Sequence, residues 1–111
     1  MTSFHVDDVR TDLAIVRVVG RLNMVSAPRL RDVVTQAVAS GKSRLVVDLA
    51  GVEFMDSSGL GALIGALKTT RQAGGDLRIA AAGEQLLMVL QLSNVDRILR
   101  PYEKADDAFS D

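Results

Sequence analysis

Three polar residues and a glycine, Asp56, Ser57, Ser58 and Gly59, stand between an apolar run and the start of an expected helix. Aspartate and serine are both preferred at helix N-caps, where one side chain contributes about 1 kcal/mol. A cap needs one such side chain, and this segment offers three. A serine at a helix N-terminus also suits a phosphate, because free backbone N–H groups and the positive end of the helix dipole stabilise a dianion. Spacing alone favours capping and leaves modification open.

A phosphate at this position would change how the segment meets another protein. Asp56 would repel the added charge. Gly59 and Gly61 would leave the backbone open for a partner to approach closely, at a cost of about 1 kcal/mol each in helix propensity. The modified state would therefore be tolerated but altered, which is the behaviour of a switch.

The other reactive side chains do not assemble into an enzyme. A nucleophile elbow requires glycine on both sides of its serine, and Ser57 has methionine two residues before it. The one histidine, His5, falls near the start of an edge strand, and there is no cysteine. Asp48 ends a strand but lacks the acidic pair of a phosphoacceptor aspartate, so we expect it to accept structural hydrogen bonds. We predict no catalytic residue, no metal site and no cofactor.

Composition predicts one domain over residues 1–111. Apolar residues make up 48% of the chain, and 13 basic residues against 14 acidic ones leave a net charge of −1. That balance gives no basic field for nucleic acid. The N-terminus has no signal-peptide pattern, and no apolar run approaches the ~18 residues that span a bilayer. We expect a cytoplasmic domain with neither nucleic acid nor a membrane as partner.

The expected elements alternate in a way that positions the DSSG segment. Strands are expected at 4–9, 13–19, 44–49, 76–81 and, as a short last strand, 97–100; helices are expected from Ser26 to a stop at Gly41, from the serines to Gly74, at 83–94 and, as a short terminal helix, at 103–109. This order predicts an α/β fold: a mixed sheet of four to five strands with about four helices, opening with an N-terminal β-hairpin and then alternating α and β. The loops "GRLNMVSAP" and "AGVEFMDSSG" should open on the same carboxyl edge of the sheet.

The stretch "VEFMDSSGLGALIGALK" resembles the signature of the STAS-domain anti-sigma factor antagonists, in which D-S-S/T-G-L-G precedes an amphipathic helix. The similarity extends over nearly the whole chain, including "VVGRLNMVSAPRLRDVV" and "LVVDLAGVEFMDSSG". It implies a single STAS-like domain and a bacterial, non-enzymatic phosphoprotein. Such a regulator acts on a sigma factor by partner switching, and so on transcription, for example in a stress response.

The resemblance also implies partners and residue roles. Ser57 is the expected phosphoacceptor of the anti-sigma factor itself, a small ATP-dependent serine kinase of the histidine-kinase ATPase fold. The unmodified antagonist binds this kinase and frees the sigma factor, the phosphorylated form releases the kinase, and a PP2C-type phosphatase restores the active form. Asp56 is expected to orient Ser57, and Ser58 to cap the helix beside Gly59. The expected partner-binding residues, on a monomer or weak dimer, are Leu22, Asn23, Met24, Val25, Ser26, Met55, Leu60 and Gly61.

One departure from the family pattern affects the expected partner. The family usually shows G-E-L/I-D after the second strand, whereas this chain has Gly20, Arg21, Leu22 and Asn23. An acidic residue is thus replaced by a basic one and another by a neutral one, on a loop expected to face the kinase. The identity of the partner therefore stays open. An alternative is a scaffold STAS subunit of a larger assembly, such as a stressosome or a lipid-transport complex.

Overall fold

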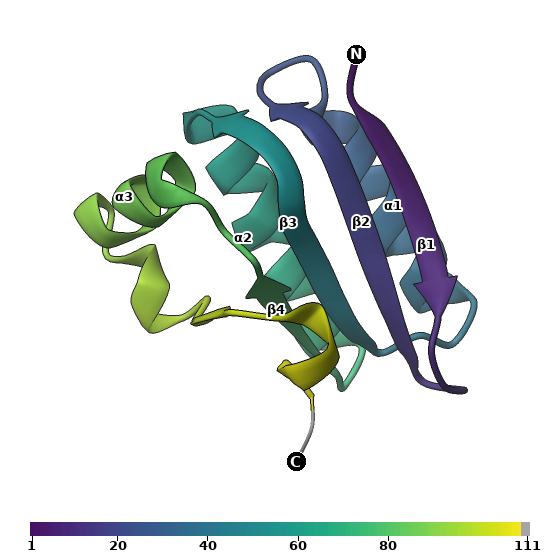
Figure 1. Cartoon of the computed structure of the whole chain (residues 1–111). Helices are drawn as coiled ribbons and strands as arrows, with labels where there is room; N and C mark the ends of the chain where they lie inside the picture. Colours follow the sequence, from purple (N-terminus) through teal and green to yellow (C-terminus); the bar gives the residue numbers. More distant parts are fainter. Residues whose placement is uncertain (110–111) are drawn as a thin grey trace.

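The computed structural model describes residues 1–109 and contains one five-stranded sheet in the order β1-β2-β3-β4-β5 (Figure 1). Its elements are β1 Ser3–Asp8, β2 Leu13–Leu22, α1 Ala27–Ala39, β3 Arg44–Met55, α2 Ser57–Gln72, β4 Asp76–Ala80, α3 Glu84–Leu92 and β5 Pro101–Tyr102, with short 3-10 helices at Val95–Arg97 and Ala105–Asp107. The first two strands are antiparallel and the others pair in parallel. The predicted mixed sheet and its N-terminal hairpin are therefore confirmed. The last two residues of the expected domain, 110 and 111, lie outside the described residues.

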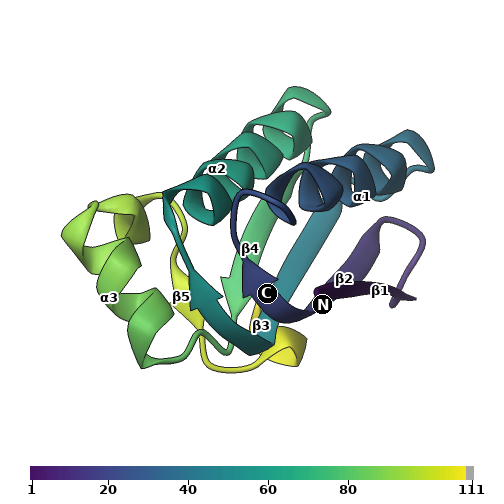
Figure 2. The ribbon, with the colours of Figure 1, turned by 90° about the horizontal axis from the view of Figure 1, so that it is seen from above.

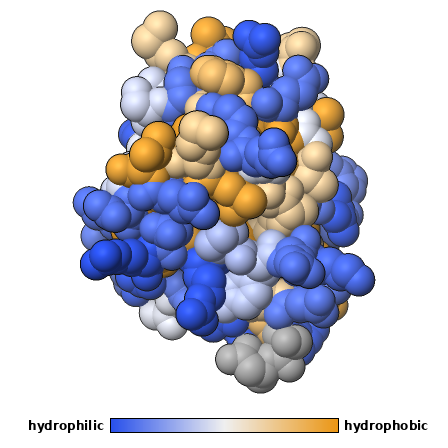
Figure 3. All heavy atoms as spheres, turned by 60° about the vertical axis from the view of Figure 1, so that its left-hand side comes forward, coloured by the Kyte–Doolittle hydropathy of each residue, from blue (hydrophilic) through white to orange (hydrophobic). Residues whose placement is uncertain are grey.

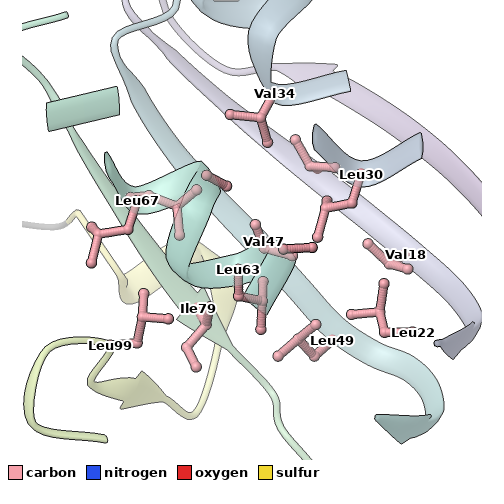
Figure 4. Packing of buried hydrophobic residues seen from close by; sticks show 14 of the residues in the cluster. Val18, Leu22, Leu30, Val34, Val47, Leu49, Leu63, Leu67, Ile79 and Leu99 are labelled. Carbon is pink, nitrogen blue, oxygen red and sulfur yellow. The ribbon is translucent and has the colours of Figure 1, made fainter. Parts of the chain in front are cut away.

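The helices α1 and α2 lie side by side over one face of the sheet, while α3 lies beside its carboxyl edge (Figure 2). Apolar side chains of both helices point at the strands beneath them, as Leu30 and Leu63 do in Figure 4. Opposite them, Val47, Leu49 and Ile79 are fully buried on β3 and β4. These strands alternate inward and outward residues, so one face of the sheet forms the main core.

Among the described residues, the other face of the sheet is covered only in part, by residues 102–109. The Phe109 ring packs on Leu13, Ile15 and Val46 near the amino ends of the parallel strands. Two guanidinium groups lie near the ring, Arg44 at 4.6 Å and Arg78 at 4.1 Å from its centroid, and Arg78 also donates to the Ala108 carbonyl. Aromatic rings attract such cations as well as burying apolar area, so the C-terminal segment is fixed to the sheet.

Removing this ring should loosen the C-terminal segment without affecting the opposite edge of the sheet. We expect Phe109→Ala to lower the free energy of unfolding by about 3 kcal/mol, at the low end for truncation of a buried phenylalanine because the ring contacts two arginines as well as apolar side chains. Urea titration followed by circular dichroism measures the loss. Phe109→Leu keeps the apolar contact and loses the cation–π contacts, so it should cost about 1 kcal/mol or less. Equal losses in the two variants would contradict a packing role.

A chain of charged side chains crosses the uncovered part of the same face. Arg17 donates from Nε to Asp7 at 2.6 Å and from Nη1 to Asp48 at 2.5 Å, and His5 approaches Asp7 at 2.8 Å. The second oxygen of Asp48 accepts from the Ala50 N–H at 3.0 Å, so this aspartate accepts structural hydrogen bonds as expected. The hydrogen bond from Arg17 holds the pKa of the Asp7 carboxyl below its ordinary value of 3.8, with a smaller contribution from His5.

The lowered pKa of Asp7 predicts a pH-dependent contribution to stability. Because the carboxyl binds its proton less readily in the folded state, its contribution is present above pH 3.8 and is lost as the pH falls through the folded pKa. The difference in unfolding free energy between wild type and Asp7→Asn should therefore shrink from pH 7 to pH 2.5 in urea titrations. Asp8→Asn is the control, since that side chain is 72% exposed and lies 3.7 Å from Lys42. A difference in unfolding free energy that grows as the pH falls would contradict the lowered pKa of Asp7.

Four expected boundaries are wrong, and in the strands this is because pairing across the sheet overrides the local pattern. β2 continues to Leu22 instead of ending at 19. β3 continues to Met55 instead of ending at 49, since its second half pairs with β2 from Val19 to Leu22 across two register shifts. The last strand is Pro101–Tyr102, not 97–100. Proline is tolerated there because β5 is an edge strand. The expected terminal helix at 103–109 contains only a 3-10 turn.

Candidate functional site at the carboxyl edge of the sheet

The DSSG segment connects the carboxyl end of β3 to the first turn of α2. Asp56 is the N-cap, with an extended backbone at φ −105° and ψ −172°, and its carboxylate accepts from the Gly59 N–H at 3.0 Å. Ser57 and Ser58 already belong to the helix. The expectation that Ser58 caps the helix is therefore wrong, because the extended residue that precedes the first turn is the one that reaches its free N–H groups.

Ser57 is exposed at the start of α2, and its hydroxyl makes no hydrogen bond within residues 1–109. The adjacent Asp56 does the capping, so the Ser57 hydroxyl has no structural task in the helix. We expected Asp56 to orient Ser57. The Asp56 carboxylate makes no hydrogen bond to the Ser57 hydroxyl and accepts from the Gly59 N–H instead. The site thus presents an unpaired hydroxyl at the positive end of a helix.

A hollow of about 330 Å³ lies between the start of α2 and the end of α3, and Ser57 is on its wall. Its lining residues are Asp56, Ser57, Leu60, Val89, Leu92 and Ser93. Leu92 is 79% exposed, and Met88 on the same helix is 58% exposed. Figure 3 shows hydrophobic residues gathered in the upper half of the face that α3 presents. An apolar surface therefore adjoins the hydroxyl on its α3 side.

The start of α2 is held against the end of β2 by a close backbone approach. The Asp56 N–H donates to the Leu22 carbonyl at 3.1 Å. A Cβ on Gly59 would lie 2.3 Å from that same carbonyl oxygen, so only glycine fits. Gly59 therefore allows α2 to pack closely on β2. The sequence had suggested instead that this glycine lets a partner approach the backbone. Gly61 faces outward, and a Cβ there would meet only the Arg31 guanidinium at 3.8 Å.

Gln85 holds the end of β3 from the opposite side. Its side-chain amide donates to the Met55 carbonyl at 2.9 Å and accepts from the Met55 N–H at 3.0 Å. This paired contact ties α3 to the residue that precedes the cap. Sequence analysis missed Gln85, Val89 and Leu92, because no local pattern indicates that α3 returns to the DSSG segment.

The loop after β2 forms the other side of the site as a closed turn. Ser26 donates to the Arg21 carbonyl at 2.6 Å and accepts from the Asn23 N–H at 3.0 Å. Asn23 accepts in turn from the Val25 N–H at 3.1 Å. Although Ser26 occupies the N-cap position of α1 as expected, its side chain bonds the loop and caps nothing. The turn leaves Met24 and Val25 exposed, at 74% and 79%.

The expected partner-binding residues divide into two groups by burial. Leu22, Ser26 and Met55 are buried, so their side chains do not reach the surface and instead support the edge from within. Leu22 and Met55 face the core because β2 and β3 run further than expected before they end, whereas the Ser26 hydroxyl bonds the backbone of its own loop. The exposed or half-buried residues are Asn23, Met24, Val25, Leu60 and Gly61. We call these five residues, together with Ser57 and Leu92, the docking edge.

The described residues offer little else for chemistry at this edge. Within residues 1–109, no three side chains of the His, Cys, Asp or Glu type gather where they could hold a metal ion. His5 lies on β1 and bonds Asp7. None of the helices in this part of the chain combines the length and the apolar character needed to cross a bilayer. The arrangement can present the Ser57 hydroxyl to the active site of another protein.

Comparison with known proteins agrees with this arrangement. The STAS domain family model matches residues 6–108. The anti-sigma-B factor antagonist of Bacillus subtilis is 30% identical over 84 residues, which cover 76% of either chain. A crystal structure of an anti-sigma factor antagonist from Mycobacterium paratuberculosis has a TM-score of 0.86 at 29% identity, covering 99% of this chain and 92% of that one. The antagonist SpoIIAA in its unphosphorylated form, with a TM-score of 0.80 at 19% identity over 95% of this chain and 92% of its own, shows the shared fold alone. Because the family model covers most of its length, the chain belongs to the STAS domain family.

Proposed function

We propose that this protein is an anti-sigma factor antagonist that binds an anti-sigma factor serine kinase and releases it when Ser57 is phosphorylated. The observation that carries the proposal is the exposed, unbonded Ser57 hydroxyl at the first residue of α2, beside an aspartate that has taken over the capping. The names of the relatives point to the same class of regulator.

The surroundings of Ser57 explain how one phosphate would end the binding. A phosphoserine adds about −1.5 to −2 charges at neutral pH. The first N–H groups of α2 would stabilise the phosphate on the free protein, but Leu60 and Leu92 offer it no polar partner. A bound kinase that covers this apolar surface would remove water from the dianion, at a cost of several kcal/mol. The phosphorylated form would therefore dissociate.

In this proposal the protein is a ligand and a substrate, and not an enzyme. ATP and its Mg²⁺ would be bound by the kinase, which has the histidine-kinase ATPase fold. A PP2C-type phosphatase, with its own Mn²⁺ or Mg²⁺, would remove the phosphate and restore binding. The exchange would take place in the cytoplasm, where these partners and the sigma factor meet.

Phosphorylation by a kinase encoded beside this protein tests the proposal directly. Incubation with that kinase and MgATP should add a single phosphate, located at Ser57 by peptide mass spectrometry. Ser57→Ala should remove the modification, whereas Ser58→Ala should keep it, because the Ser58 hydroxyl is a separate, half-buried group. Phosphate on Ser58, or no mass shift with any adjacent kinase of this fold, would contradict the proposal.

The mass of the free protein separates the antagonist from the alternative scaffold role. An antagonist must expose its docking edge to one kinase at a time, so we expect a monomer or weak dimer in size-exclusion chromatography with light scattering. Wild type and Ser57→Ala should elute alike, since the Ser57 side chain is exposed and its hydroxyl makes no hydrogen bond within residues 1–109. A large, stable particle would instead support a scaffold subunit of a larger assembly.

A further inference from the structure

Two arginines line a hollow of about 450 Å³ on the β2 side of the docking edge. Arg21 is the penultimate residue of β2, and Arg29 lies in the first turn of α1. Both side chains are exposed. Asn23 and Val25 of the docking edge line the same hollow, so the hollow adjoins this edge. The Asp56 N–H bonds the carbonyl of Leu22, the residue that follows Arg21.

The N-terminal segment holds both arginines in place. The Thr2 hydroxyl donates to the Arg21 carbonyl at 2.7 Å and accepts from the Arg21 N–H at 3.2 Å. Arg29 donates to the Thr2 carbonyl at 2.7 Å and lies 5.0 Å from the centroid of Phe4. Gly20 permits these contacts with Thr2, since its φ is +117° and a Cβ there would lie 2.9 Å from the Thr2 Cα. The hollow is therefore built from three separate segments.

Neither arginine has an acidic partner among residues 1–109. The cations that do pair with carboxylates are Arg17, Lys42, Arg44, Arg71 and Arg78, and none of these lines the hollow. Glu53 lines it but forms no ion pair with either arginine. The Arg21 guanidinium rests over the Phe54 ring at 5.8 Å, which supports it without neutralising it. Within residues 1–109, two arginines outside any ion pair thus face solvent beside the docking edge, in a hollow whose one acidic lining residue is Glu53.

We infer that this hollow receives carboxylate side chains of the anti-sigma factor, so that the partner carries an acidic segment opposite Arg21 and Arg29. The inference rests on the proposed function and specifies the chemistry of its partner. Guanidinium groups bind carboxylates through two parallel N–H donors, and arginine is enriched in protein interfaces next to aromatic and apolar residues. Here the exposed side chains of Phe54, Met24 and Val25 are the apolar residues next to the arginines. A small free anion would leave these side chains exposed to water, whereas a protein surface would cover them. The charges therefore select and steer a protein surface.

Charge reversal at Arg21 tests this inference with the kinase that phosphorylates Ser57. At low salt, Arg21→Glu should reduce the association rate constant about 10-fold and flatten its dependence on ionic strength. Arg10→Glu is the control, because it makes the same change of charge on an exposed arginine of the β1–β2 turn. At ~3.3 Å per strand residue, Arg10 lies about 30 Å from Arg21, so this variant should change the association rate constant less than about 2-fold. Stopped-flow or surface plasmon resonance measures both rates, and matched melting temperatures confirm folding.

A zero-length cross-link gives a direct readout. A carbodiimide activates a carboxylate of the partner, and an amine that touches it displaces the urea and forms an amide. Arg21→Lys should therefore yield a cross-link to an aspartate or glutamate of the kinase, identified by mass spectrometry, whereas Arg10→Lys should yield none.

The outcomes separate the inference from the function on which it rests. Equal rates for Arg21→Glu and Arg10→Glu, with Ser57 still phosphorylated, would overturn the acidic partner and leave the antagonist proposal intact. Wild type that neither binds nor becomes phosphorylated would overturn both. Inorganic phosphate at millimolar concentration that shifts the Arg21 and Arg29 side-chain resonances and competes with the kinase would show a free-anion site, which also overturns the inference.

Discussion

Gly59→Ala should lower the free energy of unfolding by about 3 kcal/mol, although alanine is the better helix former. The added methyl group would lie 2.3 Å from the Leu22 carbonyl oxygen and 2.8 Å from the Leu22 Cβ. Neither atom can move freely, because Leu22 is fully buried and its carbonyl accepts the Asp56 N–H. The start of α2 must therefore shift away from β2. Urea or thermal unfolding followed by circular dichroism measures the loss.

Gly61→Ala is the matched control two residues along the same helix. Its methyl group would meet only the Arg31 guanidinium at 3.8 Å, which is ordinary contact with a flexible group. The gain in helix propensity should then raise the free energy of unfolding by up to ~1 kcal/mol. Opposite signs at Gly59 and Gly61 would locate the effect in the contact with β2. A loss of similar size at both positions would contradict it.

The same pair of variants connects stability to the site. A shift of the first turn moves Ser57 and its cap together, so Gly59→Ala should also slow phosphorylation at temperatures where it remains folded. Gly61→Ala leaves the first turn in place, so it should slow phosphorylation less than Gly59→Ala does, and only through the methyl group that it adds to the docking edge. This separates Gly59, which positions the hydroxyl, from residues whose loss affects only the stability of the domain.

The fold could be predicted because hydrophobic periodicity and turn residues agree along most of the chain. Buried strands such as 44–49 and amphipathic helices with clear stops leave few topologies open. The second half of β3 could not be predicted, since Gly51 and the exposed Glu53 and Phe54 give it the pattern of a loop. Its pairing with the end of β2 makes it a strand. A two-residue strand at Pro101 carries too little sequence to leave a local pattern at all.

The candidate site could be located from the sequence, but the tasks of its residues could not. Asp56, Ser57 and Ser58 are all good caps, and only the backbone conformation at Asp56 decides among them. Leu22 and Met55 look available for a partner because they flank loops, yet both are fully buried. A residue's burial at the end of a strand depends on how far the neighbouring strand runs, and that is a long-range property. For the same reason, Gln85 and Thr2 gave no local signal.

Phosphorylation of Ser57 should weaken binding to the anti-sigma factor at least ~100-fold, and Ser57→Asp should weaken it about 10-fold. A loss of 100-fold corresponds to about 2.7 kcal/mol, which lies within the cost of covering a dianion with a protein surface. The aspartate carries a smaller charge on a shorter side chain, so it loses less. Isothermal titration calorimetry measures all three forms. Thr11→Asp adds one negative charge in the exposed β1–β2 turn, at the far end of the sheet, and should bind like wild type.

The salt dependence of this loss distinguishes its two physical causes. Repulsion between the phosphate and the carboxylates near it acts through solvent and weakens when the Debye length falls from about 10 Å at 0.1 M salt to less than half of that. Desolvation against Leu60 and Leu92 is screened far less, because water and ions leave the interface on binding. We expect most of the 100-fold gap between the two forms to persist at 0.5 M NaCl. A gap that closes at high salt would show that the switch acts by long-range charge, and that the apolar hollow beside Ser57 stays solvated in the complex.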